Sequence, residues 1–256
     1  MSGALEVAMV GMRAQQRSLE TIAGNISNIN TPAFKRVDLR FTELVGTGIT
    51  DGSDKVSRNG LDRVAGVSPW TVPLLDTQGQ VEATGNPLDL AIEGNGFVEL
   101  LGPGGKTLLW RGGNLRVMED GALATSSGFL LKAGINIPQD ATAMRIDRAG
   151  KVFVTMAGVT GETQLGEIGI VKVLDTSAVE RLDGGVFALN DETGVLAGAP
   201  GEDGLGGFVQ GSLERSNVDL NAEMVALLIA QRAYAANAQV ARAADEFYGV
   251  ANGLRR

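Results

Sequence analysis

The sequence predicts an α+β fold in which long N- and C-terminal helices form a coiled-coil-like domain, with an antiparallel β-rich domain inserted between them. Apolar residues recur every seven positions at both ends of the chain. The middle holds most of the 36 glycines and alternates apolar and polar residues between turns. We therefore expect a discontinuous helical assembly domain at 1–30 plus 218–256, an extended arm or linker at 31–80, and a β-rich core domain at 81–217.

The first segment predicts a helix over about residues 2–28. Pro32 ends it, because the residue before a proline is pushed out of helical geometry. One polar residue, Gln15, interrupts the heptad pattern. The apolar positions that we expect to face other helices are Leu5, Met12, Leu19, Ile22, Ile26 and Ile29.

The middle of the chain begins with a change of composition. Residues 45–66 are rich in Gly, Thr, Ser and Asp, which predicts a long exposed loop or arm. Residues 88–93 then alternate apolar and polar side chains, and the turn at 94–96 leads into a second strand at 97–101. A further hairpin is expected around the turn at 147–150. These signals predict an antiparallel β domain.

The last helix is expected to begin near Ser216 and Asp219, which have the spacing of a capping box, and to extend about 35 residues. Between 220 and 254 only five residues are charged. A lone solvated helix needs a polar back face, so we expect more than one face to be buried. The expected interface positions are Ala222, Ala226, Ile229, Ala233, Ala236, Val240, Ala243, Phe247, Val250 and Leu254.

These heptads have two interpretations. An intramolecular two-helix stalk would pair the two ends of one chain without further assembly. Assembly of many copies would cover several faces of the last helix, and its eleven alanines from 222 to 251 would let neighbouring helices approach closely. The apolar character of the whole C-terminal pattern favours assembly.

Composition limits the chemistry. The net charge is −8 and the basic residues are scattered, which argues against nucleic-acid binding. The chain contains no histidine and no cysteine, and so lacks the commonest general base and the commonest ligands of transition metals.

Three short motifs resemble ligand sites but lack the required context. Gly105-Lys106-Thr107 has Leu100 where a phosphate-binding loop needs its first glycine. The turn at 94–96 lacks the third glycine of a dinucleotide site, and Asp51 and Asp54 lack calcium-loop spacing. We expect no catalytic residues, cofactor or metal, and hence no enzyme.

Targeting signals are also weak. Residues 1–13 lack a basic region before the apolar stretch and a small-residue cleavage site, so no secretory signal peptide is expected. No apolar run approaches the roughly 20 residues that span a bilayer, so no direct membrane insertion is expected. Taken alone, these features predict a cytoplasmic protein.

Three segments, in order along the chain, resemble motifs of the flagellar basal-body rod and hook protein family. They are 25–36, 84–97 and 211–220, the last accompanied by 223–225 and 231–234. The matching residues are Asn25, Asn28, Thr31, Pro32, Phe34, Lys35, Gly85, Leu88, Asp89, Ile92, Gly94, Gly96, Phe97, Gly211, Glu214, Ser216, Asn217, Val218, Glu223, Gln231, Arg232 and Tyr234.

Within this family the chain looks most like distal-rod members, since Phe41-Thr-Glu-Leu-Val45 follows Lys35-Arg36 and the loop at 46–60 occupies the place of a rod-specific insertion. The loop is short, and a tyrosine usual in those members is missing. A proximal-rod protein is therefore the alternative within the family. Ala33 is a departure, because the family usually has glycine there.

The resemblance implies a structural subunit that self-assembles into a hollow helical drive shaft, which transmits motor torque to the hook and lets exported axial proteins pass. Its implied partners are further copies of itself, other rod proteins, the hook protein, the surrounding bushing rings and the flagellar type III export apparatus. Its implied location is the flagellar basal body, spanning the periplasm, after export without a cleaved signal peptide; this replaces the cytoplasmic expectation. A different class, a secreted β-domain binding protein with a helical stalk, is the remaining alternative.

Overall fold

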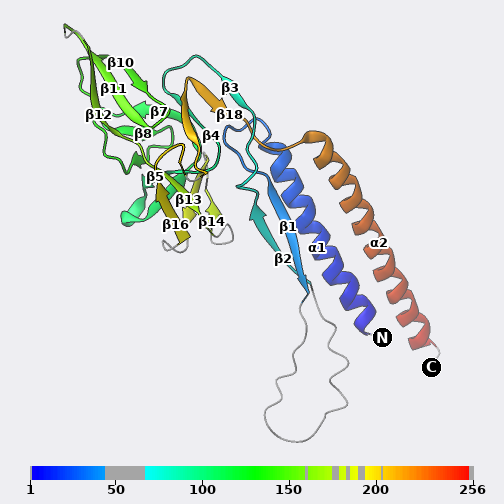
Figure 1. Cartoon of the computed structure of the whole chain (residues 1–256). Coiled ribbons are helices and arrows are strands. Elements are labelled where there is room, and N and C mark those ends of the chain that lie inside the picture. The colour runs from blue at the N-terminus through cyan, green and yellow to red at the C-terminus, as the bar shows by residue number, and fades with distance from the viewer. Residues whose placement is uncertain are drawn as a thin grey trace, which may run out of the picture. The chain divides into compact units, whose positions relative to one another are not determined.

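A computed structural model describes residues 2–43, 67–158, 161–174, 179–182, 185–189, 194–202 and 204–253 (Figure 1). The predicted arm at 45–66 and Leu254 lie outside these residues. The chain divides into two compact units. We call Met1–Ser27, Val37–Val72 and Asp219–Arg256 the helical unit, and Asn28–Arg36 with Pro73–Val218 the β unit.

The helical unit contains two helices and a strand pair. Helix α1 (Ser2–Ser27) lies beside helix α2 (Leu220–Gly253), and strands β1 (Val37–Glu43) and β2 (Val67–Pro73) form a two-stranded sheet next to α1 (Figure 1). Asp219 caps α2, because its Oδ1 accepts the N–H groups of Asn221 at 2.8 Å and Ala222 at 3.3 Å. Among the described residues, neither helix is long and apolar enough to cross a membrane.

The β unit is made of short antiparallel strands. Its nine-stranded sheet has the order β14-β15-β6-β5-β9-β8-β7-β4-β17, and smaller sheets are formed by β10-β11-β12, β13-β16 and β18-β3. The strand bounds are β3 (Val81–Ala83), β4 (Asp89–Glu93), β5 (Val98–Leu101), β6 (Thr107–Trp110), β7 (Gly112–Val117), β8 (Leu123–Thr125), β9 (Leu130–Leu131), β10 (Ala141–Ile146), β11 (Lys151–Met156), β12 (Glu162–Glu167), β13 (Ile170–Val173), β14 (Val179–Arg181), β15 (Val186–Leu189), β16 (Val195–Gly198), β17 (Gly207–Gln210) and β18 (Ser212–Glu214). A short 3₁₀ turn, η1 (Pro103–Gly105), joins β5 to β6.

The core of the β unit lies along β4, β5 and β6. Leu90, Ile92 and Leu100 are completely buried, and Trp110 is nearly so. Strand β4 is buried on both faces, since Asp89 is also inside. This strand therefore needs a polar partner for its carboxylate as well as apolar neighbours.

The predicted fold class, an α+β fold with long terminal helices forming a coiled-coil-like domain, is wrong. The described residues contain only two α-helices, and most of the chain forms a strand-rich body around a large sheet. Burial in α2 also does not follow the heptads. Ile229 and Phe247 are 63% and 69% exposed, whereas Ala230, outside the predicted set, is 3% exposed. The two helices approach each other at small residues instead. Gly11 of α1 faces Asn237 of α2 so closely that an added Cβ would lie 2.8 Å from Asn237 Nδ2.

Candidate functional site

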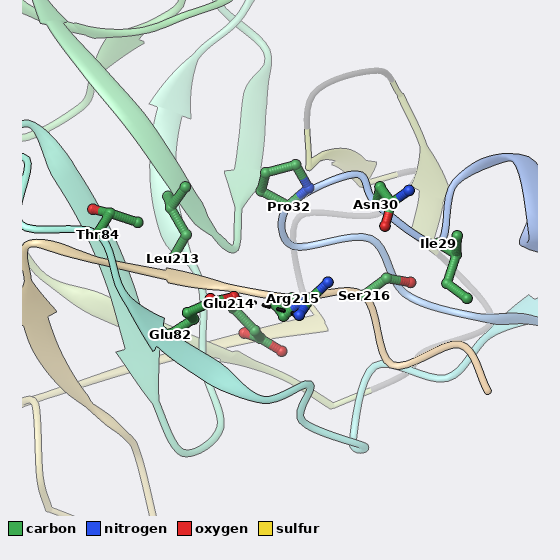
Figure 2. A pocket seen from close by; sticks show the side chains of 9 residues that line it. All are labelled: Ile29, Asn30, Pro32, Glu82, Thr84, Leu213, Glu214, Arg215 and Ser216. Carbon is green, nitrogen blue, oxygen red and sulfur yellow. Dashed lines mark ion pairs between the residues drawn. The ribbon is translucent and has the colours of Figure 1, made fainter. Parts of the chain in front are cut away.

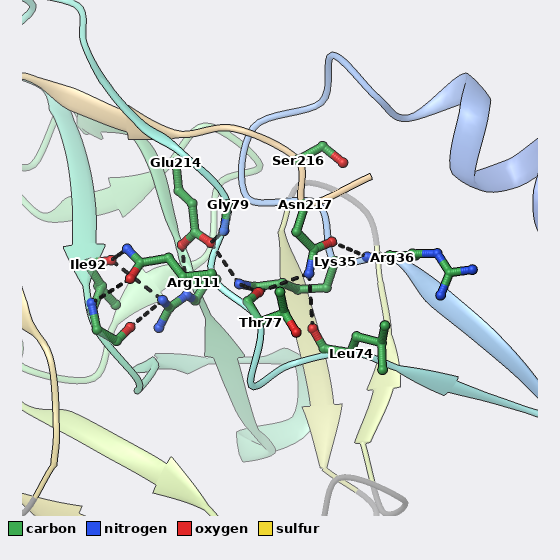
Figure 3. Close-up of polar contacts among 12 residues, drawn as sticks. Lys35, Arg36, Leu74, Thr77, Gly79, Ile92, Arg111, Glu214, Ser216 and Asn217 are labelled. Carbon is green, nitrogen blue, oxygen red and sulfur yellow. Dashed lines mark hydrogen bonds and ion pairs between the residues drawn. The ribbon is translucent and has the colours of Figure 1, made fainter. Parts of the chain in front are cut away.

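Motif residues from both ends of the chain meet in a buried charge cluster of the β unit (Figure 3). Glu214, the last residue of β18, accepts a hydrogen bond from Lys35 Nζ at 2.7 Å and one from Arg111 Nε at 2.8 Å. Lys35 and Arg111 are 0% and 1% exposed, and Glu214 is 2% exposed. One carboxylate therefore lies between two cations with almost no access to water.

Backbone groups satisfy the rest of the cluster. Lys35 Nζ also donates to Thr77 O at 2.8 Å, and Gly79 N–H donates to Glu214 Oε1 at 2.8 Å. The Arg111 guanidinium donates to the carbonyl oxygens of Gly96, at 2.5 Å, and Gly94. Buried charges are tolerated only when they are paired and hydrogen-bonded in this way.

The electrostatics of the cluster follow from burial. Burial lowers the pKa of Lys35 below its ordinary value, and the neighbouring Arg111 charge lowers it further, while Glu214 opposes both effects. Burial likewise lowers the pKa of Arg111, and Glu214 again opposes the shift. Glu214 is therefore the group that stabilises both buried cations.

Asn217 lies beside this cluster, and its side chain binds three backbone groups on two segments. Its Oδ1 accepts the N–H of Arg36 at 2.6 Å. Its Nδ2 donates to Leu74 O at 3.2 Å and to Thr77 O at 2.9 Å. Thr77 O thus accepts from both Asn217 and Lys35, which joins the amide to the charge cluster (Figure 3).

Two glycines let the backbone come close enough for these bonds. A Cβ on Gly79 would lie 1.8 Å from Arg215 O, so no other residue fits between β18 and the 73–79 segment. Gly96 has φ +132°, and a Cβ there would lie 2.2 Å from Ile170 Cγ2. Its carbonyl is one that Arg111 binds.

A second polar group forms around Asp89 of β4. Its carboxylate accepts Thr84 Oγ1 at 2.6 Å, Asn86 Nδ2 at 2.9 Å and Asn114 Nδ2 at 2.5 Å. Gly211 N–H donates to Asp89 O at 2.8 Å. The predicted motif residues of segments 84–97 and 211–220 therefore meet here, and they hold the start of β4.

The helical unit has its own buried polar pair. Asn25 of α1 exchanges two 2.9 Å hydrogen bonds with the backbone of Val37, the first residue of β1. Its Nδ2 also lies 3.4 Å from Oε2 of Glu223 on α2, and Asn25 and Glu223 are buried. These two motif residues thus connect α1, β1 and α2 within the helical unit.

A cavity of about 220 Å³ lies between the first and last motifs of the β unit (Figure 2). Its lining residues are Ile29, Asn30, Pro32, Glu82, Thr84, Leu213, Glu214, Arg215 and Ser216. Arg215 and Glu82 pair across 3.5 Å and are both more than half exposed. Among the described residues no group of three or more acidic, histidine or cysteine side chains is arranged to hold a metal.

The remaining motif residues are distributed over both units. Thr31 Oγ1 donates to Asn28 Oδ1 at 3.1 Å and closes the turn after α1. Phe34 is buried beneath the Arg181 guanidinium, which lies 3.9 Å from its ring centre, and Phe97 packs edge-on against Phe187. On α2, by contrast, the motif side chains Gln231, Arg232 and Tyr234 are exposed.

The predicted interface positions are mostly uncovered in the single chain. Ile22 is buried, and Met12, Leu19, Ile26 and Ile29 are partly buried. On α2, Ala226 and Ala233 are partly buried, whereas the other described positions are exposed: Ala222, Ile229, Ala236, Val240, Ala243, Phe247 and Val250. The structure does not describe the side chain of Leu5 or any part of Leu254. These positions therefore stay a prediction about assembly.

Sequence reasoning missed Arg111, Gly79 and Thr77. Arg111 gave one weak signal, a charge directly after the apolar run Leu108-Leu109-Trp110. Ala33 sits in this region with φ +56° and is buried, and its N–H donates to Glu214 O at 2.7 Å. An alanine thus occupies a left-handed conformation that favours glycine.

Comparison with known proteins identifies the family. Residues 5–35 match the model of the flagella basal body rod protein, residues 91–154 that of the flagellar hook protein FlgE/F/G D1 domain, and residues 209–254 that of the flagellar basal body rod FlgEFG protein C-terminal region.

Full-length relatives agree with these models. The flagellar basal-body rod protein FlgG of Caulobacter vibrioides is 36% identical, covering 98% of this chain and 99% of the relative. The FlgG of Bacillus subtilis is 32% identical over 96% of each chain. The flagellar hook protein FlgE of Brucella abortus is 32% identical over 62% of this chain and 38% of its own length. The chain therefore belongs to the flagellar basal-body rod protein family, as a structural subunit of the basal-body rod most like the distal-rod proteins.

Proposed function

We propose that copies of this chain self-assemble into a hollow helical drive shaft that transmits motor torque to the hook and lets exported axial proteins pass. The observation that carries the proposal is the uncovered apolar surface of α2. Eight large apolar side chains of this helix are between 37% and 69% exposed: Leu220, Met224, Val225, Leu228, Ile229, Val240, Phe247 and Val250. A surface of this kind marks an interface, because water disfavours it at about 25 cal/mol per Å².

These side chains spread over about 200° of the circumference of α2, at about 100° per residue. Met224, Val225 and Leu228 are exposed in addition to the heptad positions Ile229 and Phe247. Leu220 and Val240 lie at opposite edges of this arc, which is wider than the stripe that one partner helix covers. Several neighbouring copies, as in a helical tube, provide the cover on different faces.

Family membership supports assembly with other rod and hook components of the flagellum. We propose further that the partners include the hook protein, the surrounding bushing rings and the flagellar type III export apparatus, and that the rod spans the periplasm. The roles of the charge cluster are structural in this proposal, and the protein is not an enzyme.

Replacement of exposed apolar residues tests the proposal. Ile229→Ser and Phe247→Ser should leave the thermal unfolding of the purified chain nearly unchanged, because both side chains already face water. They should block rod assembly, seen by electron microscopy of basal bodies, and swimming. The matched control is Leu196→Ser in the β unit, because the Leu196 side chain is 55% exposed. Rods should assemble normally in this variant. Straight rods and swimming cells with both α2 variants at normal expression would contradict the proposal.

A further inference from the structure

The backbone passes between the two units at four places, after Ser27, Arg36, Val72 and Val218. Three segments of the β unit therefore carry every connection: 28–36, the segment beginning at Pro73, and the segment ending at Val218. If no bonds joined these three segments to one another, each segment could extend separately when the chain is under load.

The hydrogen bonds of Asn217 fall on these segments, close to where they leave the β unit. Arg36 is the last residue of the first segment, and Leu74 is the second residue of the second. The Arg36 N–H donates to Asn217 Oδ1, and Asn217 Nδ2 donates to Leu74 O and Thr77 O. Backbone bonds reinforce the same place: Leu74 N–H donates to Arg36 O at 2.8 Å, and Asn217 N–H to Phe34 O at 3.4 Å.

We infer that Asn217 is a positioning residue that fastens the exiting segments into one load-bearing bundle, which we call the exit clamp: Asn217 with the backbone of Arg36, Leu74 and Thr77. The side chain suits this role because it combines one acceptor oxygen with two donor hydrogens, and all are used here. Aspartate has no donor and alanine has neither group.

The clamp is anchored in the sheet through the charge cluster. Thr77 O binds Lys35 as well as Asn217, Lys35 pairs with Glu214, and Glu214 pairs with Arg111. Arg111 in turn binds the carbonyls of Gly94 and Gly96, which lie between β4 and β5. A pull on any one exit is thereby shared by the other exits and by two core strands.

Hydrogen exchange on the full-length purified chain tests the clamp without requiring rods. In Asn217→Ala, the amides of Arg36 and Leu74 should lose protection by about tenfold or more, while those of β4, β5 and β6 keep theirs. Asn217→Asp should keep Arg36 protected, because it retains the acceptor. It should speed exchange at Leu74, because the N–H bond from Leu74 to Arg36 O loses the support of the bonds from Asn217 Nδ2 to Leu74 O and Thr77 O. The matched control, Asn30→Ala, changes an exposed asparagine in the first segment and should resemble the unaltered chain.

Unchanged protection at Arg36 and Leu74 in Asn217→Ala would overturn the inference. A loss spread evenly over the β strands would overturn it too, because Asn217 would then act on overall stability alone. If Asn217→Ala does not fold, Asn217→Asp decides: the inference requires Leu74 to exchange faster than in the control.

The mechanical role rests on the proposed drive-shaft function and needs a load-dependent measurement. Cells with Asn217→Asp should build rods and swim in dilute medium, and should lose more speed than Asn30→Asp cells as viscosity rises. Equal load dependence in the two strains, with normal rods, would refute the clamp's mechanical role but leave the rod function intact. Absence of rods in the Asn217→Asp strain would also refute that role, because the residue would then act in assembly.

Discussion

The two units treat the same kinds of side chain in opposite ways. In the β unit, Leu90, Ile92 and Leu100 are completely buried by strands of the same chain. In the helical unit, Ile229 and Phe247 of α2 are well over half exposed. Equally apolar residues thus form a closed core in one unit and an open surface in the other.

The buried charges of the β unit are also satisfied within the single chain. Lys35, Arg111 and Glu214 satisfy one another and the backbone inside the β unit, which therefore has a complete interior as a single chain. The difference teaches that the β unit closes its core with its own strands, whereas α2 leaves apolar side chains exposed, which neighbouring subunits cover in the proposed shaft. Substitutions of buried residues in the β unit should change stability, and those on the open face of α2 should change assembly.

The largest effect should come from Glu214→Ala. It leaves Lys35 and Arg111 buried without their counter-charge, and removing one partner of a buried ion pair costs about 3–5 kcal/mol. Urea unfolding of the full chain, monitored by circular dichroism, should show this loss.

The control for this prediction is Glu82→Ala, which removes the exposed partner of Arg215. Exposed pairs contribute about 0–1 kcal/mol, so its unfolding curve should nearly overlay that of the unaltered chain. If Glu214→Ala and Glu82→Ala lowered the free energy of unfolding equally, the buried ion pairs would contribute no more to stability than an exposed pair, which would contradict the prediction.

Much of the function was predictable from the sequence, because local motifs identify the family. Lys35, Gly96 and Glu214 were all selected as motif residues, and the structure brings them to one site. Arg111, the second cation of that site, was missed because its partner Glu214 lies 103 positions further along the chain. Local spacing does not reveal such a long-range pair.

The coiled-coil-like fold was predicted wrongly for a related reason. A heptad pattern reports that a helix has apolar faces, and it does not report what covers them. On α2 the heptad residues Ile229 and Phe247 lie uncovered, and among its described apolar residues the buried one is Ala230. The predicted domain boundaries and interface residues stay predictions, since their test is the assembled rod.

The next largest effect compares two apolar truncations. Leu100→Ala in the β unit should lower the free energy of unfolding by about 2–5 kcal/mol, because it opens a cavity in a fully packed core. Ile229→Ala on α2 should change it by less than about 0.5 kcal/mol, because the side chain is already in water. Both values come from the same denaturant titration. A large loss for Ile229→Ala would show that α2 is covered within the single chain.

The smallest effect concerns Ala33, the buried residue with positive φ. Left-handed geometry costs a non-glycine residue roughly 1–2 kcal/mol, and Ala33→Gly removes that strain. Glycine adds chain entropy to the unfolded state, worth roughly 0.5–1 kcal/mol, so the net gain in unfolding free energy should lie between about 0 and 1.5 kcal/mol. The Ala33 N–H bond to Glu214 O is kept, so the charge cluster should not change. The thermal unfolding temperature should therefore rise slightly in Ala33→Gly.

The control is Ala197→Gly on the exposed strand β16, where φ is not positive and glycine should destabilise the chain. A fall in stability for Ala33→Gly equal to that of the control would mean that the alanine methyl contributes more by packing than its backbone loses by strain.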